Sequence, residues 1–186
     1  MDTLNTIPAQ LDHLIITVPD LEAGVAAVEE ATGVRAIPGG SHPGRGTANF
    51  LLGLAPTGWP EGAHTYLEIL GPDPEQDPAF AAGRLAGITT PTVQRWAIRP
   101  DDFDGVVTAA ARSREPRVDL GEVHDMTRRR PDGVVLDWRL TRRTPLPWSG
   151  IQPFLIDWKD SEHPASQEMP WVRLEKLWAA SDEPAA

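Results

Sequence analysis

The chain contains no cysteine among its 186 residues. A disulfide framework, a thiol nucleophile and a thiolate metal site are therefore excluded, and any metal ion would have to bind imidazole, carboxylate or amide groups. Gly and Pro, 16 and 19 residues, together stay below the roughly 25–30% that marks low-complexity chains. This length and composition predict a single globular domain with a sizeable core.

Long hydrophobic runs are also lacking. No apolar stretch approaches the roughly 20 residues needed to cross a bilayer, and the first ten residues, MDTLNTIPAQ, hold neither a basic segment nor a long apolar one. We therefore expect no membrane partner and a cytoplasmic location.

Basic residues are scarce, with 17 Lys and Arg against 27 Asp and Glu, a net charge of −10. Such a balance repels polyphosphate backbones, so nucleic acid is not expected as a partner. Residues 1–93 hold only 3 basic side chains against 11 acidic ones, so basic groups concentrate in the second half. The densest stretch, 128–143, contains the turn Arg130-Pro131-Asp132-Gly133. This pattern favours a solvated face of two strands over an anion site.

Hydrophobic periodicity and turn residues outline the secondary structure of the first half. They predict a strand at 11–18, a helix at 21–33, a Gly- and Pro-rich loop at 37–46, and strands at 47–54 and 64–70. The acidic and Pro-rich stretch 71–91 is the best candidate for a boundary between two halves. The second half predicts a strand and helix at 93–114, a short segment near 125–127, and strands at 134–140 and 151–158.

The two halves resemble each other when they are superimposed with a shift of 81 residues. The matched pairs are Pro19 with Pro100, Asp20 with Asp101, Gly24 with Gly105 and Val25 with Val106. The order of predicted elements repeats as well, which supports an internal duplication.

Two polar residues interrupt apolar strands of the first half. His13 lies within LDHLIITV, and Glu68 lies within YLEIL, where a buried carboxylate is costly without a cation or hydrogen-bond partners. The two side chains can share a divalent metal ion or form a plain hydrogen bond, and the spacing favours neither interpretation.

The 81-residue shift places Gln94 at the position of His13, which would add an amide oxygen to the site. The counterpart of Glu68 is either Phe154 or Asp157, depending on how a gap is placed. An inward Asp157 would complete an oxygen-rich site suited to Mn, Fe, Ni or Mg, whereas Phe154 would leave the fourth position empty.

Four segments together resemble the glyoxalase-like domain of the vicinal oxygen chelate superfamily. They are LDHLIITVPDL at 11–21, HPGRGT at 42–47 with Asn49, YLEILGPDP at 66–74, and PFLIDW with a later HPA at 153–165. The resemblance implies an α+β fold in which paired βαβββ modules form a cup-shaped mixed sheet with flanking helices. It places module one at about 8–74, module two at about 92–165, and a C-terminal extension at 166–186.

The resemblance also implies roles for individual residues. His13, Glu68 and Gln94 are the expected ligands of a divalent ion (Mn, Fe, Ni, Mg or Zn), and Glu68 can alternatively act as a catalytic base. The expected substrate-binding residues are His42, Arg45, Asn49, Trp96, Asp157 and His163. In the extension, Trp171, Leu174 and Leu177 are expected to pack against module two or to form a contact in a homodimer.

The expected function is that of a metal-dependent lyase, isomerase or dioxygenase acting on a small oxygenated organic molecule. Two alternatives remain open. One is a metal-free protein that binds a small molecule, as resistance proteins of the superfamily do, and the other is a non-catalytic interaction module. The sequence does not distinguish these, because they share one fold and differ in the surroundings of the site.

Overall fold

The structure is a computed structural model that describes residues 7–114 and 118–180. The first half of the chain forms β1 (Leu11–Thr17), α1 (Leu21–Thr32), β2 (Ile37–His42), β3 (Thr47–Pro56) and β4 (Thr65–Pro72). After the short α2 (Pro78–Ala81), the second half forms β5 (Thr92–Ile98), α3 (Phe103–Arg112), β6 (Glu122–Arg129), β7 (Val135–Arg142) and β8 (Phe154–Asp157). Two short 3-10 turns, η2 (Pro147–Gly150) and η3 (Pro164–Ser166), and the last strand, β9 (Trp171–Leu174), complete the order.

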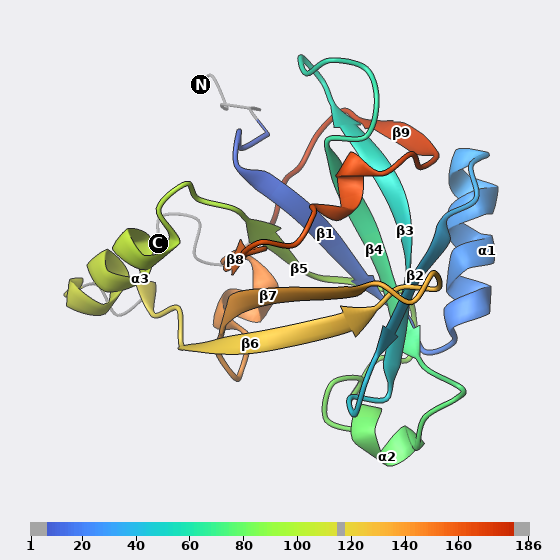
Figure 1. The fold of residues 1–186 in the computed structure, drawn as a ribbon, viewed down its shortest axis with the longest axis horizontal. Helices are drawn as coiled ribbons and strands as arrows, with labels where there is room; N and C mark the ends of the chain where they lie inside the picture. Colours follow the sequence, from blue (N-terminus) through green and yellow to red (C-terminus); the bar gives the residue numbers. More distant parts are fainter. Residues whose placement is uncertain (1–6, 115–117, 181–186) are drawn as a thin grey trace.

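The two halves have the same βαβββ order and the same strand pairing. In each, the first and last strands pair in parallel, and the other neighbours pair antiparallel. The halves join through β1 and β5 on one side and through β2 and β6 on the other. The mixed sheet therefore curls into a cup (Figure 1), which confirms the predicted α+β fold of paired modules.

An aspartate caps the start of each of the helices α1 and α3, and a glycine ends α1. Asp20 accepts a hydrogen bond from the backbone of Ala23 at the start of α1, and Asp102 does the same for Gly105 at the start of α3. Gly33 ends α1 in the left-handed conformation (φ 74°). The apolar side of α1 then covers the outer face of the first-half strands, as Figure 1 shows.

The internal repeat has a shift of 82 residues, not the predicted 81. The helix caps Asp20 and Asp102 are equivalent, and so are the first helical residues, Leu21 and Phe103, both buried. Because successive strand residues face opposite sides of a sheet, a shift that is wrong by one residue turns each predicted inward side chain outward. The structural counterpart of His13 is therefore Arg95.

Residues 37–42 form strand β2, so the predicted loop at 37–46 is wrong over this part. Its glycines are there because β2 lies very close to its neighbours. A Cβ on Gly39 would lie 2.3 Å from the Asn49 side chain, and one on Gly40 would lie 2.1 Å from the carbonyl oxygen of Arg129. Glycine here permits close approach where the modules join, beside a register irregularity between Pro38 and Gly40.

The C-terminal strand β9 pairs in parallel with β3, so it extends the first module and not the second. Leu174 and Leu177 pack with Leu11, Leu14 and Leu54. The expectation that this extension packs against module two is therefore wrong, because the open edge that it covers belongs to β3.

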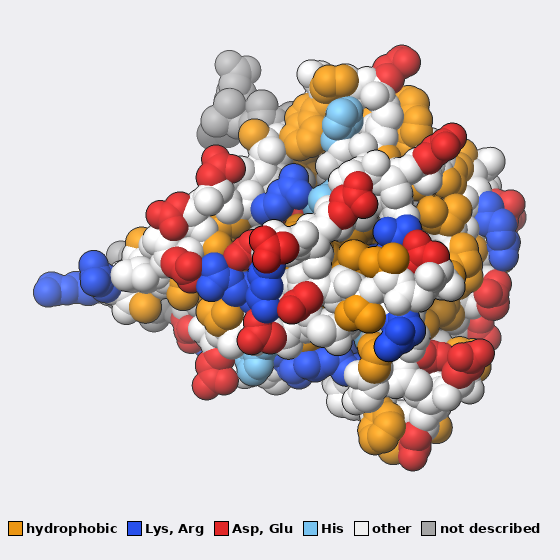
Figure 2. Space-filling model, viewed as in Figure 1, with side chains coloured by type: hydrophobic (Ala, Val, Ile, Leu, Met, Phe, Trp, Pro, Cys, Tyr) orange, Lys and Arg blue, Asp and Glu red, His pale blue; other side chains and the backbone are white. Residues whose placement is uncertain are grey.

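The arginine-rich stretch is mostly exposed, as expected for strands with a solvated face. Arg139, for example, binds Asp104 and Asp157 at 2.8 Å, and Figure 2 shows basic and acidic side chains interspersed on the visible face. Arg128 and Arg142 are the exceptions, because both line the cavity of the cup; Arg128 is only 2% exposed. Among the described residues, no helix is long and apolar enough to span a membrane.

Candidate active site

The interior of the cup contains a cavity of about 440 Å³, a size suited to one small molecule. Both modules line it. The polar side chains at its centre are His13, His42, Asn49, Glu68, Arg95 and Arg128.

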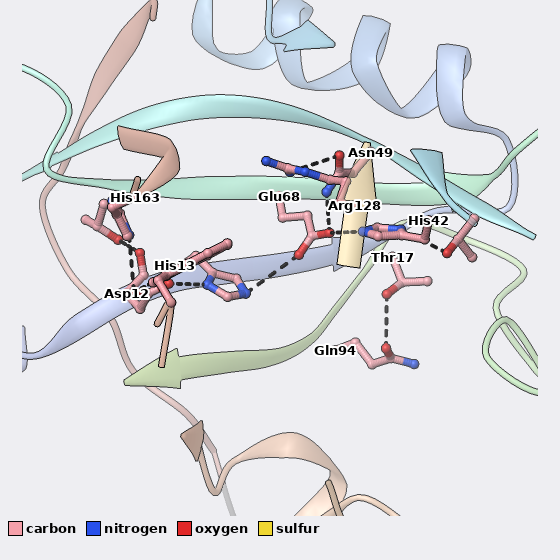
Figure 3. A network of polar contacts seen from close by, with 12 residues as sticks. Asp12, His13, Thr17, His42, Asn49, Glu68, Gln94, Arg128 and His163 are labelled. Atoms are coloured by element: carbon pink, nitrogen blue, oxygen red, sulfur yellow. Dashed lines mark hydrogen bonds and ion pairs between the residues drawn. The ribbon is translucent and has the colours of Figure 1, made fainter. Parts of the chain in front are cut away.

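Glu68 is a buried carboxylate on β4, 8% exposed, between two histidines (Figure 3). Asn49 donates a hydrogen bond from Nδ2 to Glu68 Oε1 at 2.6 Å, while Asn49 Oδ1 accepts one from Arg128 at 3.3 Å. Burial opposes ionisation, yet the pKa of Glu68 lies below its ordinary value of 4.5, because His13 and the Asn49 hydrogen bond favour the charged form. No residue within 7–114 or 118–180 forms a hydrogen bond with Glu68 Oε2, so this oxygen is available to a ligand.

His13 lies beside Glu68 and is held in a fixed orientation. Its Nδ1 donates to Asp12 Oδ1 at 2.6 Å, and its Nε2 lies 3.6 Å from Glu68 Oε2. The ring stacks on Tyr66 with centroids 4.7 Å apart and meets Phe154 edge-on. The imidazole therefore presents one nitrogen to the carboxylate and the cavity.

Asp12 anchors this arrangement from outside the cavity wall. In a regular strand Asp12 would face the side opposite to His13. A register irregularity between Leu11 and His13 lets the Asp12 side chain reach the His13 ring. Asp12 Oδ2 accepts hydrogen bonds from His163 Nε2 and Trp158 Nε1, both at 3.1 Å. Burial would raise the pKa of Asp12, but the hydrogen bonds from the two histidines hold it well below its ordinary value.

His42, at the end of β2, faces Glu68 from the other side. Its Nε2 lies 4.0 Å from Glu68 Oε1, and its Nδ1 is 3.1 Å from the hydroxyl of Thr47. The pKa of His42 is lowered to about 4, mainly by burial; the nearby Glu68 opposes this shift and Arg128 contributes to it. His42 is therefore neutral at neutral pH.

The structure brings some of the predicted site residues together but not all of them. His13, His42, Asn49 and Glu68 meet at the centre, and Arg45 lies on the cavity wall near the exposed side. His163 is not on the wall; it donates a hydrogen bond to Asp12 and its ring contacts Tyr66 and Trp158, which do line the cavity.

Three predicted residues of the second module lie away from the cavity wall. Gln94 accepts hydrogen bonds from Thr17 and Arg84, as Figure 3 shows for Thr17. Trp96 donates to the backbone of Ile151 and packs on the outer side, and Asp157 binds Arg139. The 81-residue shift accounts for Gln94 and Trp96, since the inward residue of β5 is Arg95. On β8 the inward residue is Phe154, the other of the two candidates for the counterpart of Glu68.

Several cavity residues were missed in the sequence. Arg84 follows α2, Arg142 ends β7, and Tyr66 belongs to the segment that contains Glu68. A repeat shift of 82 would have found Arg95, and strict alternation from Glu68 would have found Tyr66. Arg84 carries no such sequence signal.

Whether these side chains can hold a divalent metal depends on which residues of the second module occupy the positions equivalent to His13 and Glu68. His13 and Glu68 converge as two ligands of one ion would. Ile15 pairs with Glu68 and Ala97 pairs with Phe154, so Phe154 is the counterpart of Glu68, as Arg95 is of His13. A guanidinium and a phenyl ring do not bind metal ions. In the described part of the chain, no group of three or more His, Asp or Glu is arranged to hold an ion, so the residues do not form a complete metal site.

A cup of paired βαβββ modules with a histidine and a glutamate on its floor defines a protein of the vicinal oxygen chelate class. The chain belongs to the glyoxalase-like domain family, whose model matches residues 11–186. Members of this superfamily commonly bind divalent metals.

Solved structures of methylmalonyl-CoA epimerases are similar to this chain. One, in complex with methylmalonyl-CoA and NH4+, shows 25% identity and a TM-score of 0.52 over 83% of this chain and 98% of its own. A variant of the Streptomyces coelicolor enzyme, bound to 2-nitronate-propionyl-CoA, shows 25% identity and a TM-score of 0.51 over 79% and 95%. No curated protein matches the sequence.

Proposed function

We propose that this protein is an isomerase-type enzyme that removes a proton from carbon next to a carbonyl group of a small oxygenated organic molecule, with Glu68 as general base. The observation that carries the proposal is the ionised, buried Glu68, whose Oε2 faces the cavity without a hydrogen bond from any described residue. The epimerases that resemble this chain belong to the same general reaction class.

The chemistry follows from the positions of the groups. Glu68 Oε2 takes the proton from carbon, and the electron pair of the C–H bond moves to the carbonyl oxygen as an enolate forms. Negative charge on that oxygen is stabilised by the buried guanidinium of Arg128. His13 Nε2, 3.6 Å from Glu68, is placed to exchange a proton with the same region of the substrate. In a 2-hydroxy carbonyl compound, Glu68 then returns the proton to the neighbouring carbon while His13 moves the hydroxyl proton between the two oxygens, so the carbonyl group changes position and the carboxylate is regenerated.

Proton exchange in D2O tests this function before the natural substrate is known. Small 2-oxo acids, 2-hydroxy aldehydes and methylmalonyl-CoA are incubated with the protein, and replacement of C–H by C–D is followed by NMR. We expect exchange with at least one compound, slowed about 10²- to 10⁴-fold by Glu68→Gln. The control is Glu61→Gln, whose side chain is 84% exposed. Equal exchange in Glu68→Gln and the unaltered protein refutes the proposal.

A metal-dependent reaction is the second candidate, because His13 Nε2 and Glu68 Oε2 converge at 3.6 Å. It is distinguished by elemental analysis of protein purified without a histidine tag. Stoichiometric metal that disappears in both His13→Ala and Glu68→Gln would favour it. Absence of metal together with base-dependent exchange favours the metal-independent proton transfer. Ligand binding without exchange in any compound would favour the binding-protein alternative.

A further inference from the structure

Positive charge exceeds negative charge around the cavity. Among the described residues that line it, Glu68 is the one carboxylate, whereas five are arginines: Arg45, Arg84, Arg95, Arg128 and Arg142. Within residues 7–114 and 118–180, no acidic side chain forms an ion pair with any of these five. In contrast, Arg139 on the outer surface has two acidic partners. The protein as a whole is strongly acidic, so this positive interior is a local feature.

Two of these arginines are close enough to repel each other and are nevertheless fixed in place. Burial lowers the pKa of Arg84 to about 9 and that of Arg95 to about 10, and the charge of Arg95 also lowers the pKa of Arg84. Both remain charged at neutral pH. Gln94 Oε1 accepts a hydrogen bond from Arg84 Nη1 at 2.5 Å, and the Arg95 guanidinium lies 5.3 Å from the centre of the Phe154 ring. Repulsion of this kind is offset when an anion lies between the groups.

Arg128 adds a third positive charge, which the nearby Glu68 attracts but with which no described carboxylate forms an ion pair. It is 2% exposed, and its described partner is the neutral Asn49 side chain; Nε and Nη2 have none within the described residues. A buried guanidinium without a carboxylate partner is costly in the empty cavity. A negatively charged ligand would lower that cost.

We infer that the cavity binds a small organic anion, whose carboxylate or phosphate group lies among Arg84, Arg95 and Arg142 while its reactive carbon faces Glu68. The inference deepens the proposed function and rests on it for the role of Glu68. Arg142 is placed with the other two because its charge acts on both. Guanidinium groups match the planar geometry of carboxylate and phosphate oxygens. The cavity of about 440 Å³ is large enough for a small molecule.

Calorimetric titration of the full chain with three probes tests the inference. Succinate carries carboxylates, glycerol 3-phosphate carries a phosphate, and succinamide is the uncharged analogue of succinate. We expect at least one anion to bind and succinamide to bind about tenfold more weakly or not at all. The better of the two anions identifies the chemical group. No binding by either anion, or equal binding of succinate and succinamide, overturns the inference.

Variants assign the binding to the arginines. Arg95→Met keeps an apolar side chain against Phe154 and should weaken anion binding about tenfold, whereas Arg95→Lys should retain part of it. Arg129→Met, an exposed neighbour of Arg128, is the control. If Arg95→Met does not fold, Arg84→Gln on the segment after α2 serves in its place. Unchanged affinity in the folded variant overturns the inference.

Glu68→Gln separates this inference from the proposed function. Anion binding that survives in this variant while C–H exchange is lost supports both. Anion binding with exchange unaffected by Glu68→Gln refutes the proton transfer alone. Exchange that requires Glu68 but is indifferent to ligand charge and to Arg95 refutes the anion site alone.

Discussion

Acidification should destabilise the fold through His42 before it acts on most carboxylates. This imidazole is 7% exposed and lies between Glu68 and the hydroxyl of Thr47. Burial lowers its pKa from the ordinary value of 6.5 to about 4 in the folded chain. Between these two values the unfolded chain holds a proton on this residue that the folded chain does not. The free energy of unfolding therefore falls as the pH is lowered through this window.

The magnitude follows from the difference between the two pKa values. At ~1.4 kcal/mol for each pH unit, a full passage from 6.5 to about 4 removes about 3 kcal/mol. Between about pH 7 and about pH 4.5 the expected loss is roughly 2–3 kcal/mol. Such a loss is a large share of the ~5–15 kcal/mol that stabilises an ordinary domain.

Urea unfolding followed by tryptophan fluorescence measures this loss at both pH values. The test variant is His42→Asn, whose side chain has no titrating group in this range and keeps an amide near Thr47. We expect the unaltered protein to lose about 2–3 kcal/mol more than the variant on acidification. His124→Asn, on β6 with its side chain 38% exposed, controls for the removal of an imidazole as such. The same pH dependence in His42→Asn and the unaltered protein would refute the reasoning.

Three further substitutions, the last with a matched control, test other parts of the structure by urea unfolding at neutral pH. Asp12→Asn removes the buried charge that orients two histidines and should cost about 3 kcal/mol; unchanged stability would show that the network contributes little. Gly24→Ala should destabilise by about 1–3 kcal/mol despite the better helix propensity of alanine, because the new Cβ would lie 2.7 Å from Val18; a gain in stability would contradict this contact. Leu51→Ala, at a fully buried position, should cost about 2–5 kcal/mol, whereas Val135→Ala, 50% exposed, should cost less than about 1 kcal/mol.

The sequence was sufficient to predict the fold because both modules carry strong local signals. The strand containing His13, the Asp-capped helix after it and the strand containing Glu68 are all found where periodicity placed them. Gly39 and Gly40, in contrast, led to a wrong prediction, a loop in place of strand β2. Their composition is typical of a loop, while their actual role is the close approach of β2 to β3 and β6, which depends on contacts distant in the sequence.

The structure brings the candidate residues of the first module together in the cavity, whereas Gln94, Trp96 and Asp157 of the second module lie away from its wall. His13, Asn49 and Glu68 meet because they lie on the adjacent strands β1, β3 and β4 and all face the inside of the cup. In the second module, a repeat shift wrong by one residue exchanged Gln94 for Arg95. Side chains of a strand alternate between the two faces, so an inward and an outward residue are neighbours in the sequence. The amino-acid composition of the strand therefore cannot show which of the two faces the cavity.

The duplicated architecture gives the cavity two chemically different sides. Strand positions that carry His13 and Glu68 in one module carry Arg95 and Phe154 in the other, and all four side chains line the same cavity. The positions that hold His13 and Glu68 in the first module therefore hold a cation, Arg95, and a phenyl ring, Phe154, in the second module. An asymmetric ligand with one anionic end has a single favourable orientation in this field, with that end toward the second module. In the proposed anion site, this orientation directs the rest of the molecule to Glu68, so the proton is taken by a residue of the first module while arginines of the second module, Arg95 and Arg142, hold the anionic end together with Arg84.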